Sequence, residues 1–299
     1  MEPITLHANG LTFSALSEVP VLPKGEGPVA LCLHGFPDHM RSFRFQLPAL
    51  AAAGYRAIAP CLRGYEPSSQ PANGDYHIVR MAEDVIAQVD FLGTEPVHLI
   101  GHDWGAVIGY AAAALAPDHF HSLTTLAIPH PGRMQREGLR EFPGQLRKSW
   151  YMMFFQLRGI ADLVVERNDW AFIERLWRDW SPGWELPEEE VRIVKRALAQ
   201  PGVKKAALAY YRSMFGFAGA AARETRRLLG GEIPVPTLAL TGALDGCMDT
   251  RMHDVAMRDE DFPAGFKMVR IRDAGHFLHQ EKPGEINRVL LDWLAAHRG

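Results

Sequence analysis

LIGHDWGA, at residues 99–106, is the stretch on which the rest of this chain is organised. An apolar run that begins at Val97 leads into it, and a run of small residues, 106–115, follows it. Together they predict a strand, a sharp turn and a helix, which is the context that a G-x-Nu-x-G nucleophile elbow needs. Gly101 and Gly105 favour a strained turn, because a side chain at either position would crowd the crossing backbone. Such a turn would hold Asp103 above the sheet.

Residue 103 is Asp and neither Ser nor Cys. A carboxylate at the tip of an elbow can attack carbon and form an ester. Asp is also a favoured residue at the N-terminus of a helix, so Asp103 could instead serve only as a helix cap. The pentapeptide alone leaves both interpretations open, and the rest of the chain has to decide between them.

The composition is that of an ordinary globular protein. The chain has 299 residues, 47% of them hydrophobic and 22% charged, which allows a large core in one or two domains. Its net charge of −3 gives no reason to expect nucleic acid or an anionic membrane as a partner. We find no apolar stretch of the roughly 18 residues that a spanning helix needs, and no secretory signal. The scattered Cys32, Cys61 and Cys247 fit neither a metal site nor a disulfide framework, so we expect a cytoplasmic protein.

Strand-like and helix-like runs alternate along most of the chain. Strands are expected at 4–8 and 11–17, around an Asn-Gly hairpin turn, and at 29–33, 55–59, 97–100, 123–128, 235–241 and 268–271, with a turn at 24–28. Helices are expected at 42–53, 79–92, 106–115 and 285–297. In the second of these helices, Asp84 and Asp90 fall on positions expected to be polar. The alternation predicts an α/β fold in which helices cover both faces of a mostly parallel central sheet.

The pattern changes between about residues 131 and 231. No run there is convincingly strand-like, and aromatic residues and methionines crowd together with charges at helical spacing. Pro182-Gly183 and Pro201-Gly202 would break the helices. We therefore expect an all-helical cap at 132–231, inserted into a core domain made of 1–131 and 232–299. Most of the cap's aromatic residues are expected to pack in its own core.

Three polar residues follow predicted strands in the order nucleophile, acid, base. Asp103 ends one strand, Asp245 follows the strand 235–241, and His276 follows the last strand. An elbow-bearing sheet presents its triad in this order, and open α/β sheets place their sites at the carboxyl ends of the strands. One of 13 histidines near a strand end would mean little alone, but its match to two earlier acids is informative. Asp249 is the alternative acid, and Asp245 is preferred because it directly follows the strand.

The chain resembles the α/β-hydrolase superfamily over essentially its whole length, and within it the epoxide hydrolases. HGFP at residues 34–37 matches that family's H-G-x-P oxyanion-loop motif, GHDWG at 101–105 its nucleophile motif, and GHF at 275–277 its base motif. In the predicted cap, Tyr151 and Tyr211 stand where the family carries its two ring-opening tyrosines, with Tyr210 as the alternative for the second. Glu66 stands where the family often has glycine, which leaves the shape of that loop open.

The resemblance implies conversion of an epoxide to a vicinal diol. Asp103 would attack an epoxide carbon and form an ester, while the phenols of Tyr151 and Tyr211 would donate to the leaving oxygen. His276, oriented by Asp245, would activate the water that hydrolyses the ester. Backbone N–H groups of two residues would hold the oxyanion, and several loop and cap residues would contact the substrate. The oxyanion pair is Phe36 and Trp104, and the substrate contacts are His34, Phe36, Pro37, Trp104, His130, Phe155 and Phe277.

No metal or organic cofactor is expected. The expected partners are a small epoxide and water, bound by a monomer or a homodimer. His34 and His102 are expected mainly to form hydrogen bonds behind the loops, and His279 to be peripheral. For His130, a surface position is an equal alternative to the pocket.

Four other functions are weighed at this point. A haloalkane dehalogenase resembles this chain in its Asp nucleophile and the following Trp, but it needs halide donors, such as Asn at the position of Phe36. A fluoroacetate dehalogenase would be expected to carry Arg in place of Trp104, and a serine esterase would carry Ser in place of Asp103. A hydrolase fold that binds ligand without turnover would be favoured by an incomplete triad, whereas all three triad residues are present here.

Overall fold

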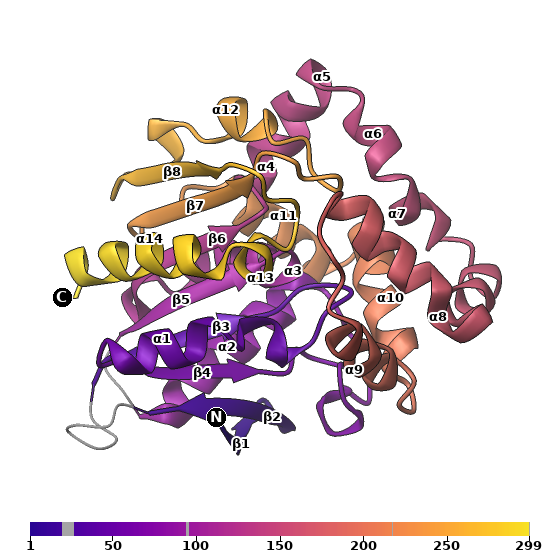
Figure 1. Cartoon of the computed structure of the whole chain (residues 1–299), viewed down its shortest axis with the longest axis horizontal. Helices are drawn as coiled ribbons and strands as arrows, with labels where there is room; N and C mark the ends of the chain where they lie inside the picture. Colours follow the sequence, from indigo (N-terminus) through magenta and orange to yellow (C-terminus); the bar gives the residue numbers. More distant parts are fainter. Residues whose placement is uncertain (20–26, 94–95, 217, 299) are drawn as a thin grey trace.

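The computed structural model describes residues 1–19, 27–93, 96–216 and 218–298. The turn expected at residues 24–28 lies largely outside these ranges, and so does Phe217 of the predicted cap. Eight strands in this part of the chain form one sheet in the order β1-β2-β4-β3-β5-β6-β7-β8 (Figure 1). The strands are β1 (Glu2–Ala8), β2 (Leu11–Glu18), β3 (Val29–Leu33), β4 (Arg56–Pro60), β5 (Val97–His102), β6 (Phe120–Leu126), β7 (Thr237–Gly242) and β8 (Phe266–Ile271).

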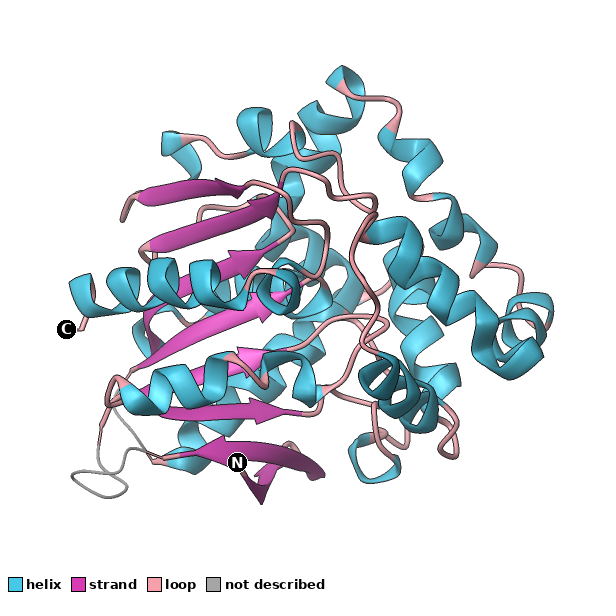
Figure 2. Cartoon of the chain, in the orientation of Figure 1, coloured by secondary structure: helices cyan, strands magenta, loops and turns pink. Residues whose placement is uncertain are grey.

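The sheet is parallel from β4 to β8, and the hairpin β1–β2 joins it antiparallel through β2. Every residue of β3 and β5 is buried, as expected for central strands covered on both faces. One face packs against α1 (Gln46–Ala52) and α14 (Pro283–Ala296), and the other against α2 (Ile78–Leu92) and α3 (Trp104–Leu115) (Figure 2). The predicted α/β architecture is confirmed.

Two details of the predicted core are wrong. The helix expected at 42–53 is a 3-10 turn, Met40–Phe43, followed by the shorter α1. Pro48 explains the later start, because proline lacks an N–H and is tolerated only in the first turn of a helix. Asp84 on α2 is not a solvent-facing residue: it is 3% exposed and accepts two hydrogen bonds of 2.6 Å from Arg63. In the sequence pattern, an aspartate in a buried ion pair cannot be distinguished from one that faces solvent.

Helices alone connect β6 to β7 in the described part of the chain. Those formed by residues 145–214 lie beyond the carboxyl ends of the parallel strands (Figure 1). The connecting helices are α4 (Pro131–Arg133), a π-helical turn (Met134–Gly138), α5 (Leu139–Glu141), α6 (Gln145–Lys148), α7 (Trp150–Phe154), α8 (Ile160–Trp180), α9 (Glu188–Leu198), α10 (Val203–Met214) and α11 (Ala220–Gly230). α8 has a kink at residues 167–170, where Asn168, Asp169 and Trp170 have positive φ. The division into a cap at 132–231 and a core stays a prediction, since α11 packs on α2 and α3 of the core layer.

Short elements complete the connections at the edges of the sheet. They are 3-10 turns at Pro67–Ser69, Pro117–His119 and Asp259–Asp261, together with α12 (Met252–Ala256) and α13 (Leu278–Glu281). Among the described residues, no helix combines the length and the apolar character required to cross a bilayer.

Candidate active site

Asp103 sits at a sharp elbow between β5 and α3, with φ 50° and ψ −116°. A Cβ atom on Gly101 would lie 2.3 Å from the carbonyl oxygen of Gly105, and one on Gly105 would lie 2.1 Å from that of Leu33. Both positions therefore require glycine. A positive φ at a non-glycine residue costs about 1–3 kcal/mol and is retained where the surroundings enforce it. The elbow therefore holds the Asp103 side chain in one place.

The Asp103 carboxylate is turned towards two other segments rather than onto its own helix. Oδ1 accepts a 2.8 Å hydrogen bond from the backbone N–H of Phe36, and Oδ2 lies 3.5 Å from Nε2 of His276. Within the described residues the side chain makes no capping hydrogen bond to α3. Burial alone would raise the pKa of Asp103, but the contact with His276 outweighs it and lowers the pKa below its usual value. The group is a buried carboxylate, with one oxygen bound by the N–H of Phe36 and the other facing the imidazole of His276.

His276 links Asp103 to a second carboxylate. Its Nδ1 lies 2.9 Å from Oδ2 of Asp245, while Oδ1 of Asp245 accepts hydrogen bonds from the N–H groups of Cys247 and Met248. Burial of the imidazole would lower the pKa of His276, but the two carboxylates overcome this effect and raise the pKa to about 10. Asp249, the alternative acid, is hydrogen-bonded to Arg251 instead.

The C-terminal end of α8 joins the loops of the acid and the base. The carbonyl oxygen of Trp180 accepts hydrogen bonds from the N–H of Gly246, at 2.9 Å, and from the N–H of His276, at 3.1 Å. The approach is close enough that a Cβ on Gly246 would lie 1.9 Å from the carbonyl oxygen of Asp179. We call this contact the Trp180 joint. Sequence reasoning missed it, since the only local signal is a glycine next to Asp245, the predicted acid.

Two tyrosines from different helices face each other above the elbow. Tyr151 of α7 and Tyr211 of α10 have ring centroids 5.7 Å apart. The Tyr151 hydroxyl lies 3.4 Å from the thiol of Cys247, and the buried Tyr211 hydroxyl has no hydrogen-bond partner among the described residues. Burial raises the pKa of both phenols well above the usual value, so both stay protonated at neutral pH. The neighbouring Tyr210 donates a 2.6 Å hydrogen bond to the carbonyl of Arg63 instead.

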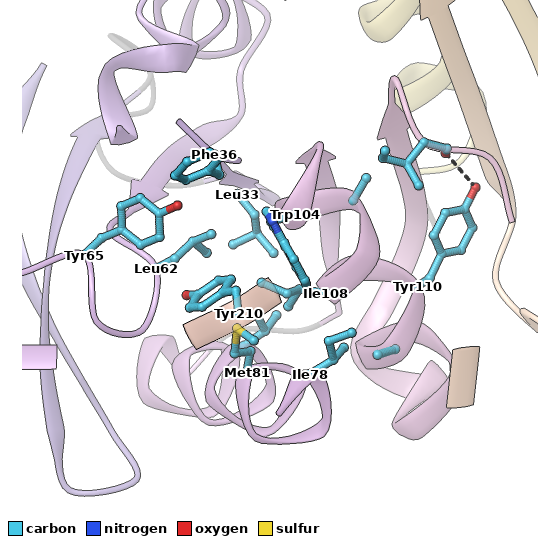
Figure 3. Packing of buried hydrophobic residues seen from close by; sticks show 14 of the residues in the cluster. Leu33, Phe36, Leu62, Tyr65, Ile78, Met81, Trp104, Ile108, Tyr110 and Tyr210 are labelled. Atoms are coloured by element: carbon cyan, nitrogen blue, oxygen red, sulfur yellow. Dashed lines mark hydrogen bonds between the residues drawn. The ribbon is translucent and has the colours of Figure 1, made fainter. Parts of the chain in front are cut away.

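Aromatic rings enclose the Tyr211 side. The ring of Tyr211 lies 5.2 Å from that of Phe36 and 5.0 Å from those of Trp104 and Phe155, measured between centroids. Figure 3 shows Trp104 beside Leu33, to one side of Phe36 and Tyr210, with Ile108 below it. The structure thus brings an ionised carboxylate, a histidine and two phenols into apolar surroundings, where charges and hydrogen bonds are stronger than in water.

Known proteins resemble the chain in both sequence and structure. A family model described as alpha/beta hydrolase fold matches residues 28–158. Epoxide hydrolase A of Mycobacterium tuberculosis is 32% identical and is covered over 93% of its length by 92% of this chain. Epoxide hydrolase 3 of Siraitia grosvenorii is also 32% identical, with 98% of each chain covered. The chain belongs to the epoxide hydrolase family. The identification from the three motifs and two tyrosines is therefore confirmed.

Solved structures of this family superpose closely on the chain. An epoxide hydrolase from an endophytic Streptomyces has a TM-score of 0.79 at 30% identity, and covers 99% of this chain and 96% of its own. A variant of the Bacillus megaterium epoxide hydrolase, complexed with its product, a naphthyloxy-propane-1,2-diol, has a TM-score of 0.82 at 27% identity, and the match covers 98% of this chain and 100% of that one. The chain is thus an enzyme of the epoxide hydrolase family with the α/β-hydrolase fold.

Several residues predicted to contact substrate have other partners in this member of the epoxide hydrolase family. The two ring nitrogens of His34 contact the carbonyl of Gly35 and the N–H of Leu62. Those of His130 contact the carbonyl of Gly231 and the N–H of Arg133, so His130 is a buried helix cap and not a surface residue; its place in the pocket stays a prediction. These contacts give both histidines a role in shaping loops.

Pro37 and Phe277 contact the end of α8 rather than the two tyrosines. The Pro37 carbonyl accepts a 2.7 Å hydrogen bond from the indole of Trp177, and the Phe277 ring stacks on that indole at 4.4 Å. Phe277 also lies 5.4 Å from the ring of His276. Of the predicted substrate contacts, Phe36, Trp104 and Phe155 are the ones that surround Tyr211.

His279 is not peripheral, contrary to the prediction. It is fully buried, and its Nε2 lies 2.6 Å from the Ser42 hydroxyl, which donates a 2.5 Å hydrogen bond to Asp38. Its ring lies 4.5 Å from that of His102, whose Nε2 donates to the carbonyl of His276. A polar chain therefore runs behind the base. Burial raises the pKa of Asp38 to about 7 and lowers that of His279.

Two buried groups in the described chain bring metal-binding atoms within 4.8 Å of one another: Asp38, His102 and His279, and Asp245, Cys247 and His276. In the first group, the Ser42 hydroxyl already lies between Asp38 and His279. In the second, the facing atoms of Asp245 and His276 form the hydrogen bond that orients the base. Both groups are better described as hydrogen-bond networks.

Proposed function

We propose that the protein hydrolyses an epoxide to a vicinal diol through a covalent ester on Asp103. The observation that carries the proposal is an ionised Asp103 with one oxygen held by the N–H of Phe36 and the other facing His276. A carboxylate held in this way is a nucleophile that needs no base to activate it. The diol product of the related Bacillus megaterium enzyme supports the same reaction class.

Ring opening would use the free oxygen of Asp103. Oδ2 attacks an epoxide carbon, the C–O bond of the ring breaks, and the electron pair moves to the ring oxygen. That oxygen becomes an alkoxide unless a donor protonates it, and the two buried phenols are the available donors. Tyr211 is the better placed, since no acceptor in the described residues takes its hydroxyl proton and the neighbouring Trp104 indole can only donate to it. The Tyr151 hydroxyl, in contrast, is hydrogen-bonded to the thiol of Cys247.

Hydrolysis of the ester would follow from a change in charge at Asp103. The pKa of His276 is high because two carboxylates surround the imidazole. Esterification removes the charge of one of them, so the pKa of His276 falls. The imidazolium gives up a proton, which replaces the one that the phenol gave to the ring oxygen, and the neutral imidazole becomes a base. It takes a proton from water as the water oxygen attacks the ester carbonyl, and the oxyanion forms at the oxygen that Phe36 N–H already binds. The oxyanion then collapses, the ester bond to the diol oxygen breaks, and that oxygen takes the proton from His276, which restores the Asp103 carboxylate. Trp104 N–H, at the start of α3, is the proposed second donor.

The decisive experiment separates the two steps with His276→Gln. This variant should form the ester and fail to hydrolyse it, so that its intact mass rises by one substrate after mixing with an aryl epoxide. Digestion should place the added mass on the peptide that contains Asp103. Asp103→Asn, which keeps the side-chain size, should gain no mass.

The origin of the water oxygen gives an independent test. Wild-type protein turned over once in heavy-oxygen water should carry the label in the carboxylate of Asp103, because water attacks the carboxyl carbon. Heavy oxygen found only in the diol would mean that water attacks the epoxide directly, and the covalent mechanism would be wrong. Haloalkanes assayed beside the epoxides should release no halide.

A further inference from the structure

A row of exposed apolar side chains follows the outer side of α6, α7 and the beginning of α8. We call this row the cap stripe. Trp150 and Met153 of α7, and Ile160 and Leu163 of α8, are three positions apart, as on one side of a helix, while Leu157 lies in the turn that joins the two helices. Their exposed fractions range from 39 to 63%. The members are Leu146, Trp150, Met153, Leu157, Ile160 and Leu163.

The mechanism proposed above does not use the cap stripe. The site is built from the opposite side of the same segment, where Tyr151 and Phe155 are buried. In Figure 1, α6, α7 and α8 run along the edge of the molecule that is farthest from the sheet. Large apolar residues gathered on one exposed edge of a globular protein are typical of an interaction surface.

The unpaired charges beside the stripe are basic. Residues 144–161 include Arg147, Lys148 and Arg158 and no acidic residue. Asp162, between the stripe members Ile160 and Leu163, pairs with Arg212, and Glu166 pairs with Lys204. Lys148 is turned inward and donates to the carbonyl of Asp245. Arg147 and Arg158 are exposed and have no acidic partner among the residues that the structure describes. The stripe is therefore locally basic, although the chain as a whole carries a net charge of −3.

We propose that the cap stripe binds the surface of an anionic lipid bilayer. Apolar side chains flanked by arginine, with a tryptophan among them, are the composition of a helix that lies in a membrane interface. Arg147 and Arg158 contact lipid phosphates, while Trp150, Met153 and Leu163 enter the boundary of the acyl chains. The sequence-based expectation of no membrane partner rested on the net charge and on the lack of a spanning helix, and neither property describes this local surface.

A second copy of the chain fits the stripe less well. In a two-fold symmetric dimer the same patch meets itself, so each copy would bring its unpaired arginines towards those of the other. Like charges without acidic partners disfavour that contact at low salt, whereas anionic headgroups neutralise them. The sign of the charge therefore selects lipid over self-association.

Vesicle binding tests the proposal directly. The full chain is mixed with vesicles of phosphatidylcholine, with or without 30% phosphatidylserine, and bound protein is measured by co-sedimentation on the order of 0.05 M salt. We expect binding to the anionic vesicles and a loss on the order of tenfold in Arg147→Gln/Arg158→Gln. Met153→Gln/Leu163→Gln should bind less to the same vesicles. Lipids with brominated acyl chains should quench the tryptophan fluorescence of the wild type, and Trp150→Phe should remove most of that quenching.

Matched variants elsewhere on the surface serve as controls. Arg223→Gln/Arg288→Gln makes the same change in net charge, and Phe45→Gln/Phe91→Gln removes two exposed apolar side chains outside the stripe. Both controls should bind as the wild type does, and all stripe variants should keep wild-type turnover of a water-soluble epoxide. The proposal is overturned if the wild type does not bind anionic vesicles, or if the control and the stripe variants lose binding equally. It is also overturned if the wild type forms a dimer that Met153→Gln/Leu163→Gln abolishes, while neither the wild type nor this variant binds vesicles.

Discussion

Tyr210 and Tyr211 are adjacent in the chain and have different partners. The hydroxyl of Tyr210 is used in a hydrogen bond to the carbonyl of Arg63, and that of Tyr211 has no partner in the described structure. The sequence motif left the register open by one residue, because both positions carry the same side chain. The helical turn of α10 separates their directions by about 100°, which is a property of the fold and not of the motif.

We expect Tyr211→Phe to slow ring opening at least tenfold and Tyr151→Phe/Tyr211→Phe to slow it by about 10²–10⁴, the usual contribution of a general acid. Stopped-flow tryptophan fluorescence measures the ester-forming step. Tyr210→Phe is the matched control: it should keep the rate of that step and lower the free energy of unfolding by about 1 kcal/mol through one lost hydrogen bond. A slower step in Tyr210→Phe alone would assign the donor to Tyr210.

The raised pKa of His276 predicts a pH dependence of stability. Its folded pKa, about 10, lies above the unfolded value near 6.5, so the protonated imidazole stabilises the fold fully below about pH 6.5. That stabilisation is lost as the pH rises towards 10. In Asp103→Asn one carboxylate is gone, and the folded pKa of His276 should fall.

Urea denaturation between pH 7 and pH 10 measures this difference. The free energy of unfolding should decline less steeply with pH in Asp103→Asn than in the wild type, and the titration of the His276 ring by NMR should move to lower pH. Equal slopes and an unmoved titration would show that Asp103 does not influence the base, and the charge change proposed for ester hydrolysis would then have no basis.

At the scale of elements, the loop after β4 is held by one buried and one partly buried contact that the sequence pattern conceals. Arg63 pairs with Asp84 of α2, and the carboxylate of Glu66 accepts hydrogen bonds from the N–H and the hydroxyl of Ser14 on β2. Glu66 has φ −149°, an extended conformation that needs no glycine. Its departure from the family pattern therefore adds an anchor to the sheet and does not strain the loop.

Asp84→Ala should lower the free energy of unfolding by about 3–5 kcal/mol, because it leaves the Arg63 guanidinium buried without its partner. Asp90→Ala on the same helix removes a carboxylate that is 67% exposed, and should change stability by less than about 0.5 kcal/mol. Chemical denaturation of the two variants side by side makes the comparison. Similar losses in both would mean that the Arg63–Asp84 pair contributes no more than a surface pair.

For the molecule as a whole, the sequence predicts the features that depend on residues close together in the chain. The apolar run of β3 and the glycines around Asp103 are local patterns, and the structure has the strand and the elbow where these patterns place them. The hydrogen bond between the side chains of Tyr151 and Cys247, 96 positions apart in the chain, depends on how the helices lie over the sheet. No pattern in one segment contains that information, which is why the surroundings of Tyr151 could not be predicted.

The Trp180 joint limits the routes by which substrate can enter the site. The Trp180 carbonyl accepts hydrogen bonds from the N–H groups of both Gly246 and His276. Movement of the end of α8 away from the sheet would therefore displace the loops of Asp245 and His276 together. We therefore expect substrate to enter beside helices that are not hydrogen-bonded to these loops, while the Trp180 joint stays formed. In hydrogen–deuterium exchange, we expect the amides of Gly246 and His276 to exchange in one slow event, and those of α9, whose Glu190 is bonded to Arg41 and not to these loops, to exchange faster. Gly246→Ala would place a Cβ atom against the carbonyl of Asp179 and so break the Trp180 joint. This variant should lower the rate of ester hydrolysis more than that of ester formation. Turnover would then be limited by a contact that does not touch the substrate.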